Sequence, residues 1–448
     1  MNKLIISILL STALFANINI YSAWQNVLNN NDGLKASQGD IKHAKLKKES
    51  AEGMYLPSLS INGSYTHLND SIGIDISDIS NRLNPIISAL GGKKISSEID
   101  FLDQDIALVD LNLLYPLYVG GKIDAAQDAY MAKVSEMKAK YRMAKDKSFL
   151  ELIKLYYGVV MTNALYKTRL ESQKSFHLHY QHAQKLREQG QISRVELLNS
   201  KVKFDIAKIE TTKAKHKVDI VASAFYKMIK SKNRPNSSLF VLHKIEDEYK
   251  FSDKSISNHS AIDILNAKSK EAQALIDVEK SAWYPEVLGY ANMNLHRGDS
   301  LLEEISPSWM VGVGVKFNIL SRKDRSKEIE AAKILHAKVA LLKAQTREDL
   351  SLAVQKTYDE MTLYRDEFES LSSSLALAKE NYKLRSLAFK EGLSTTTEVV
   401  DAQVLLTGAK TQRLNAAYNY VNRLAMLCVL SGDRELFFKF EKLSKGIK

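Results

Sequence analysis

Short segments in which apolar and polar residues alternate predict four β-strands. In SWMVGVGVKFNIL, residues 308–320, every second side chain from Trp309 to Ile319 is apolar and most others are polar or small. In SLSINGSYTH, residues 58–67, Leu59, Ile61 and Tyr65 alternate with polar residues. A repeat of two residues places these sets on opposite faces of a strand. Their length and alternation suit a membrane barrel, although a half-buried sheet of a soluble domain would show the same pattern. The predicted strands lie at about residues 57–69, 104–118, 285–297 and 308–320.

Two much longer amphipathic segments predict helices of unusual length. Residues 123–188 and 325–390 each contain 66 residues and no proline, which corresponds to about 100 Å of helix. Both carry an apolar stripe in alternating steps of three and four, which requires neighbouring helices to cover it. In the second segment the stripe consists of Met361, Tyr364, Phe368, Leu371, Leu375, Ala378 and Tyr382. The neighbours are predicted as shorter helices at residues 33–54, 193–230, 261–284 and 395–430.

The sequence contains an internal duplication. Its two glycine turns, Gly190 and Gly392, lie 202 residues apart, and the strand ends at Leu117 and Ile319 have the same offset. This period, close to half the chain, indicates a duplicated unit and not a solenoid. The first half also carries a long loop, Asp70–Asp103, between its strands. The predicted parts are a signal peptide (1–16), a first repeat (17–230), an equatorial linker (231–260), a second repeat (261–431) and a C-terminal tail (432–448).

The first residues have the pattern of a secretory signal peptide. Lys3 precedes a largely apolar run from Leu4 to Phe15, and the small residue Ala16 follows. We predict cleavage after Ala16, with Ala23 as the second choice, whereas a buried N-terminal helix is the alternative interpretation. The protein is therefore expected to be exported.

Composition and charge point away from nucleic acid and from catalysis. The net charge is +11, but basic residues are interspersed with acidic ones, as on solvated helix faces. His177, His179 and His182 point in different directions around a helix, so one metal ion would not engage all three. The single cysteine, Cys428, lies in an apolar run and is expected to be a small buried hydrophobe. We therefore expect no enzyme, no cofactor and no metal site.

Four strands do not close a barrel. An open sheet with an apolar face would expose its edges, which hydrocarbon does not tolerate. Three copies would supply twelve strands, an even number within the range of outer-membrane barrels. The sequence therefore predicts that several chains assemble.

Several motifs together resemble one known family. YLPSLSINGSY (from Tyr55), LLYPLYVGGKIDAA (from Leu113) and KEGLSTTTEVVDAQ (from Lys390) occur in a duplicated helix and hairpin plan behind a signal peptide. This combination is similar to the TolC-like outer membrane factors, the outer membrane efflux protein family. The Gly-Gly turn from strand to helix that is common in that family occurs only once here, at Gly120 and Gly121.

The resemblance implies a membrane α+β fold. Each protomer would give four strands to a trimeric, twelve-stranded outer-membrane β-barrel, which a long periplasmic α-helical coiled-coil barrel would continue. Such a homotrimer conducts small toxic molecules or drugs passively, as the exit duct of a tripartite efflux pump. Its partners would be a periplasmic adaptor, an inner-membrane transporter and outer-membrane lipid, and not nucleic acid. The same duct serving type I protein secretion is an alternative, and a periplasmic coiled-coil adaptor is a more distant one.

The two glycine turns are the candidate tips of the helical hairpins. Glycine at the end of a helix tolerates the positive φ of a reversing turn, and Ser193 or Ser394 is expected to cap the returning helix, with Glu196 or Glu398 completing a capping box. The resemblance adds docking of the adaptor at these tips. The docking candidates are Gly190, Ile192, Ser193, Gly392, Leu393 and Ser394.

Two carboxylates next to the second tip are the candidate gate. Glu398 and Asp401 are three residues apart and share one helix face, so a trimer would bring six carboxylates towards a common axis. The resemblance implies an acidic constriction at the periplasmic entrance. Glu196 and Asn199 are the less acidic counterparts in the first repeat. The alternative is that Glu398 only caps its helix and Asp401 is solvated.

Overall fold

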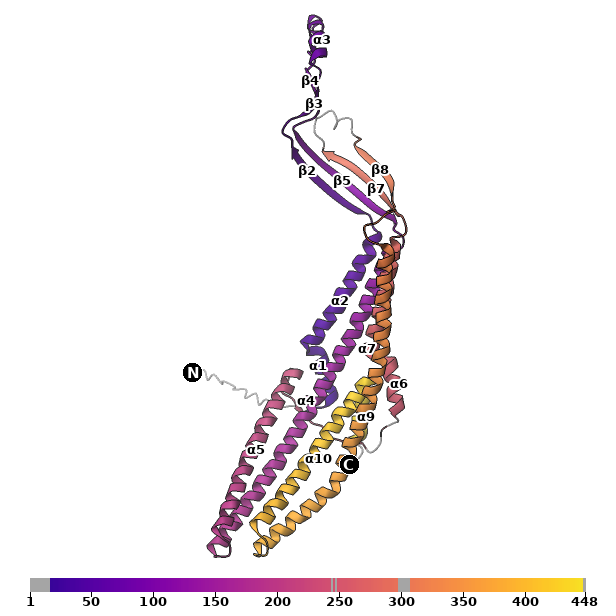
Figure 1. Ribbon diagram of the computed structural model, residues 1–448. Coiled ribbons are helices and arrows are strands. Elements are labelled where there is room, and N and C mark those ends of the chain that lie inside the picture. Colours follow the sequence, from indigo (N-terminus) through magenta and orange to yellow (C-terminus); the bar gives the residue numbers. More distant parts are fainter. Residues whose placement is uncertain (1–16, 243–244, 246–247, 297–306, 446–448) are drawn as a thin grey trace, which may run out of the picture. The chain divides into compact units, whose positions relative to one another are not determined.

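The computed structural model describes residues 17–242, 245, 248–296 and 307–445 (Figure 1). The predicted signal peptide lies outside these residues. The contacts divide the chain into two compact units. One combines Met1–Lys42, Ser135–Ala267 and Ala340–Lys448, and the other combines His43–Val134 and Lys268–Val339. Each unit takes segments from both predicted repeats.

The second unit contains the predicted sheet of four antiparallel strands. Strands β2 (Ser58–His67), β5 (Asp105–Tyr118), β7 (Glu286–His296) and β8 (Trp309–Lys316) lie side by side in the order β2-β5-β7-β8 (Figure 1). Strands β2 and β8 are the two edges. β8 ends four residues before the predicted strand does, and Leu320 is 94% exposed.

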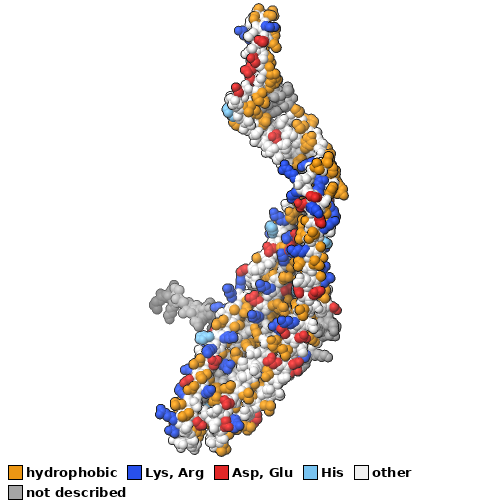
Figure 2. Space-filling model, in the orientation of Figure 1, with side chains coloured by type: hydrophobic (Ala, Val, Ile, Leu, Met, Phe, Trp, Pro, Cys, Tyr) orange, Lys and Arg blue, Asp and Glu red, His pale blue; other side chains and the backbone are white. Residues whose placement is uncertain are grey.

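The alternation of side chains produces two different faces on this sheet. Val311, Val313 and Val315 point to one face, where they are 71%, 64% and 68% exposed. The other face carries a ladder of polar groups, in which the Asn62 amide donates to Asp110 at 3.2 Å and the Asn292 amide donates to Asn112 at 2.7 Å. Figure 2 shows few charged side chains over the strands and many along the helices.

The long loop between the first two strands has a structure of its own. It contains a small antiparallel hairpin, β3 (Ile72–Asp75) with β4 (Glu98–Leu102), and between its strands the helix α3 (Ser77–Ala89). In Figure 1 this hairpin extends from the end of the sheet that is away from the helices. The sequence predicted only a loop here.

The predicted long helices are confirmed. Helix α4 spans Lys122–Glu188 and α9 spans Arg325–Lys390, with 67 and 66 residues. None of the helices in the described ranges has both the length and the apolar content needed to cross a lipid bilayer. The shorter helices are α1 (Ile20–Asn30), α2 (Asp32–Glu52), the 3-10 turn η1 (Gly53–Tyr55), α5 (Arg194–Ile229), α7 (Ser260–Ser281) and α10 (Thr396–Leu430).

In the first unit, four helices form a layer in the order α5, α4, α10, α9 (Figure 1). Polar contacts join each neighbouring pair. Thr211 of α5 donates to the Arg169 carbonyl of α4 at 3.1 Å, Lys410 of α10 pairs with Glu171 of α4 at 2.7 Å, and Arg423 of α10 pairs with Glu360 of α9 at 3.1 Å. Helices α5 and α9 therefore form the two sides of the layer.

The linker and the tail are more ordered than their polar composition suggested. The linker contains the short strand β6 (Arg234–Pro235) and helix α6 (Glu248–Asn258), and the tail contains α11 (Glu435–Lys445). The strand β1 (Asn17–Ile18) pairs with β6 in parallel. Phe437 of α11 is fully buried beside Phe149 and Tyr157 of α4. Cys428 is buried in the same core, as predicted.

Candidate functional site

The two hairpin turns are built in the same way. Gly190 and Gly392 both have φ of +73°, and a Cβ added at either position would meet no neighbouring atom, so backbone conformation alone favours glycine. At the first turn the Gln191 amide donates to the Leu186 carbonyl at 2.8 Å, and at the second the Leu393 amide donates to the Ala388 carbonyl at 2.8 Å. This is the Schellman ending of a helix, repeated with the offset of the duplication.

A small apolar core joins the two hairpins just above their turns. We call this the tip cluster. It brings together residues of α4, α9 and α10, with residues of the first turn and α5 packed against it. Its members are Ala183, Leu186, Phe389 and Val399, with Ile192, Leu197 and Tyr382 partly buried against them. Movement of one tip relative to the other must therefore repack these side chains.

The helices that return from the two turns have different capping residues. Ser193 caps α5, and its hydroxyl accepts from the Glu196 amide at 3.2 Å, as predicted. The prediction that Ser394 caps the second helix is wrong, because Thr395 is the capping residue of α10. A capping box needs the acidic residue three positions after the cap, and only Thr395 has this spacing to Glu398.

Glu398 is fully engaged in this cap. Its Oε2 accepts from the Ser394 hydroxyl at 2.6 Å and from the Thr395 amide at 3.0 Å, while Arg385 of α9 pairs with Oε1 at 3.1 Å. The hydrogen bond from Ser394, followed by the one from the Thr395 amide, lowers the pKa of Glu398 below its ordinary value, and the nearby Arg385 charge adds to the shift. Glu398 is therefore an ionised carboxylate whose charge Arg385 largely offsets.

Asp401 is in a different situation from Glu398. It is exposed, and no hydrogen bond or ion pair joins it to any residue in the described part of the chain. In the first repeat, Asn199 is also exposed and Glu196 is half-buried. The structure thus separates the two candidate gate acids into one that is bound within its own hairpin and one that faces solvent.

The docking candidates differ in how much of them is accessible. Leu393 is 81% exposed, whereas Ile192 of the first turn is half-buried against the tip cluster. Gly190, Gly392 and Ser193 are exposed, and Ser394 is half-buried. Arg187 donates to the Ile192 carbonyl at 3.2 Å and so closes the first turn. At the second turn Arg385 instead pairs with Glu398.

Sequence reasoning missed two side chains near the tips. Arg385 contacts Glu398 across the hairpin, and His179 of α4 lies with its ring centroid 4.3 Å from that of Phe389 in α9. His179 is only 6% exposed. The Thr-x-x-Glu spacing was a readable signal for the cap, but no local pattern indicates the contact between His179 and Phe389.

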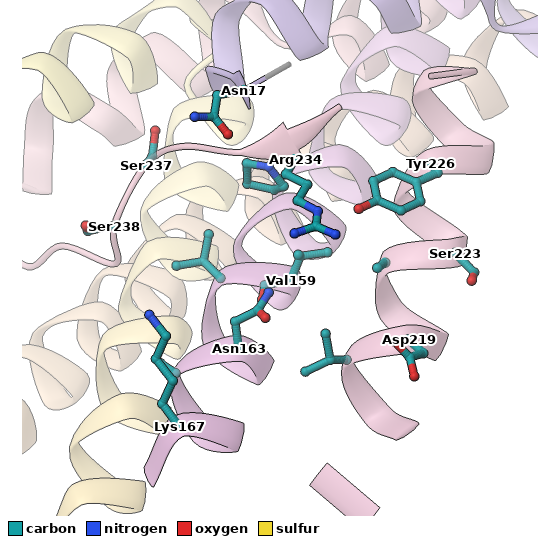
Figure 3. A pocket seen from close by; sticks show the side chains of 15 residues that line it. Asn17, Val159, Asn163, Lys167, Asp219, Ser223, Tyr226, Arg234, Ser237 and Ser238 are labelled. Atoms are coloured by element: carbon teal, nitrogen blue, oxygen red, sulfur yellow. The ribbon is translucent and has the colours of Figure 1, made fainter. Parts of the chain in front are cut away.

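A cavity of about 670 Å³ lies away from the tips, between α4, α5 and the linker (Figure 3). Lys167, Asn163 and Asp219 line it from the helices, and Arg234 and Ser237 line it from the linker. None of the predicted site residues borders it.

Comparisons with known proteins give one family match and several solved structures with a similar fold. The model of the outer membrane efflux protein family matches residues 252–433. CusC overlays with a TM-score of 0.77 at 13% identity, covering 94% of this chain and 93% of CusC. The Campylobacter jejuni CmeC outer membrane channel gives 0.74 at 17%, covering 96% and 90%. The Neisseria gonorrhoeae MtrE outer membrane channel, in its open state, gives 0.74 at 16%, covering 94% and 90%. No curated protein sequence matches.

These comparisons confirm three of the predictions. The family match confirms the resemblance, and with it the expected location in the outer membrane. The likeness to the solved channels confirms the fold, in which a duplicated chain combines four barrel-type strands with very long helices.

Proposed function

We propose that this protein belongs to the outer membrane efflux protein family, whose model matches residues 252–433, and that it forms one third of a passive exit duct for small toxic molecules or drugs. The observation that carries the proposal is the four-stranded sheet. It has an exposed apolar face, a polar face and two edges, β2 and β8, that pair with no further strand in the described part of the chain. In a bilayer these edges require partners, because unpaired backbone groups in hydrocarbon cost several kcal/mol each.

Three copies satisfy this requirement. Pairing β2 of one copy with β8 of the next gives a closed barrel of twelve strands, with the valine-rich face towards lipid and the asparagine ladder towards the lumen. Fewer copies leave the polar interior too narrow for a water-filled lumen, since barrel diameter grows with strand number.

The sides of the helical layer support the same assembly. Helix α5 carries an exposed stripe formed by Val195, Leu198, Val202, Ile206 and Ile209, which are between 48% and 65% exposed. Helix α9 exposes Leu363, Leu377 and Leu384 at heptad intervals. Apolar stripes with this spacing are covered by neighbouring helices. We propose that α5 of one copy packs against α9 of the next and so extends the tube into the periplasm.

The tips would form the periplasmic entrance and the docking site for an adaptor that links the duct to an inner-membrane transporter. Leu393 is the most accessible apolar residue of the docking candidates. Asp401 is the stronger gate candidate, because its charge is unpaired among the described residues whereas Arg385 offsets that of Glu398. Both acids stay in the proposal, with Glu196 and Asn199 as their counterparts.

The test combines mass with conductance. Native mass measurement in mild detergent is expected to find three copies, and the protein in planar bilayers is expected to conduct ions with a preference for cations. Asp401→Asn should weaken this preference, whereas Glu391→Gln, which removes another exposed carboxylate of the second tip, serves as the matched control. A monomer without conductance would refute the duct. Trimeric channels with unchanged selectivity in Asp401→Asn would refute only the gate.

A further inference from the structure

The external hairpin carries an apolar stripe that nothing in the described part of the chain covers. Ile79, Leu83, Ile86 and Leu90 lie along one side of α3 and its last turn, and they are 56%, 41%, 58% and 81% exposed. We call these four residues the α3 seam. Figure 2 shows apolar side chains at this end of the hairpin. Four large aliphatic side chains in a row are far more than the scattered apolar residues of an ordinary surface.

A different side of the same helix attaches it to the hairpin. Ser80 is 1% exposed and Ile87 is half-buried. The Asn84 side chain donates to the Ile95 carbonyl at 2.9 Å and accepts from the Ile95 amide at 2.7 Å. At Gly92 a Cβ would approach Ile87 Cγ2 to 2.8 Å, so the turn packs closely on the helix. The seam is therefore held outward by contacts on the neighbouring side of the helix.

The spacing and identity of the seam residues indicate what covers them. Steps of four, three and four place Ile79 and Ile86 at heptad position d, and Leu83 and Leu90 at position a. Leucine at a with isoleucine at d favours bundles of three or four helices over pairs. A helix of 13 residues that contains a proline, Pro85, is also marginal by itself in water, so its stability calls for packing against partners.

The width of the seam disfavours a membrane surface as the occupant. The charges around it are mixed, with Asp75 and Glu98 facing each other across the two strands and Lys93 and Lys94 just beyond the helix. A stripe confined to heptad positions a and d has the width that a neighbouring helix covers, whereas a helix that lies in a membrane surface has a wider apolar face. Copies of the same chain remain as the partner that matches the apolar stripe, because a rotation axis presents identical stripes to one another.

We propose that the α3 helices of three copies pack seam to seam into a helical cap over the external mouth of the duct. The cap rests on the trimer of the proposed function. The hairpin leaves the sheet at the end away from the helices, which is the external end if the helices are periplasmic (Figure 1). The edge strand β2, which would pair with the next copy, leads directly into the hairpin.

Disulfide trapping tests the cap. Leu83→Cys places a thiol in the seam, and Ser88→Cys places one on the opposite side of the same helix as the matched control. The natural Cys428 is buried and stays silent. With mild oxidant on intact cells, Leu83→Cys should form linked pairs on the order of tenfold more than Ser88→Cys, because disulfides require Cα atoms within about 7 Å. Ile86→Cys should repeat the result.

Conductance then tests the position of the cap. Linked Leu83→Cys channels should conduct less than the same channels after reduction, whereas Ser88→Cys channels should not change. If native mass shows trimers but Leu83→Cys links no better than Ser88→Cys, the cap is refuted and the duct stands. Linking without any change in conductance would refute its position over the mouth. A protein without trimers would refute the proposed function itself.

Discussion

Acidification is predicted to loosen the contact between the two hairpins next to the tips, through His179. This side chain of α4 is 6% exposed and packs on Phe389 of α9, and its Nε2 has no hydrogen-bond partner among the described residues. Burial, and to a lesser degree the charge of His182, lowers the pKa of His179 to about 4. The pKa of His182 is also lowered, first by burial and then by Lys390 and Lys185.

The size of the effect follows from the two pKa values of His179. Unfolded histidine titrates near 6.5 and the folded residue near 4. At 1.36 kcal/mol per unit the difference amounts to about 3 kcal/mol. The folded state holds the ring neutral, so this stabilisation is fully present above pH 6.5. It is lost progressively as the pH falls from 6.5 to 4, because protonation then favours conformations in which the ring reaches water.

Hydrogen exchange at the tips measures this loss. Protection of the amides around His179 and Phe389 should fall between pH 7 and pH 5 once the intrinsic dependence of exchange on pH is removed. In His179→Leu this fall should become shallower, because only the contribution of His182 remains, whereas His177→Leu, a substitution at an exposed neighbour, should retain it. The comparison uses the slope of protection against pH and not its absolute level, because the substitution also changes packing. An equally steep fall in His179→Leu would refute the reasoning.

Three further predictions concern the turns and the N-terminus. Gly392→Ala should lower the free energy of unfolding by about 1–2 kcal/mol in denaturant titrations, since alanine is strained at φ of +73°, whereas Gly39→Ala in the open interior of α2 should raise it slightly. Thr395→Ala should cost about 1 kcal/mol by the same measurement, because it removes the helix cap, and an unchanged midpoint would contradict this. Mass measurement of the mature protein should show that it begins at Asn17 and not after Ala23. Cleavage after Ala23 would remove Ile20, whose side chain is fully buried, and the pairing of β1 with β6.

The overall fold was predictable because local sequence patterns specify its strands, helices and turns. Alternation along residues 308–320 and the heptad stripe of residues 325–390 each depend only on nearby residues, and the structure has a strand and a helix there. The offset of 202 residues between Gly190 and Gly392 identified the duplication, and both glycines have the expected positive φ. Patterns of this kind can be read from the sequence without knowledge of tertiary contacts.

What was missed depends on tertiary neighbours or on a finer reading of spacing. Thr395 is readable as the cap, since Glu398 follows it by three residues and it lies 202 residues after Ser193, whereas matching Ser193 by residue type to Ser394 gives the wrong position. His179 and Phe389 are far apart in the sequence, and only the packing of the two hairpins brings them together. α3 was not predicted, because it is short and interrupted by a proline.

The hydroxyl of Tyr156 connects parts of the chain that lie far apart in sequence. It donates to the Ile18 carbonyl at 2.9 Å and lies 3.0 Å from the Ser237 hydroxyl, which donates to Glu441 at 2.8 Å. Residues close to both ends of the described chain thus meet around one tyrosine. These two segments lie close together in space. A circular permutant that joins them and opens the chain at another loop would therefore keep its architecture.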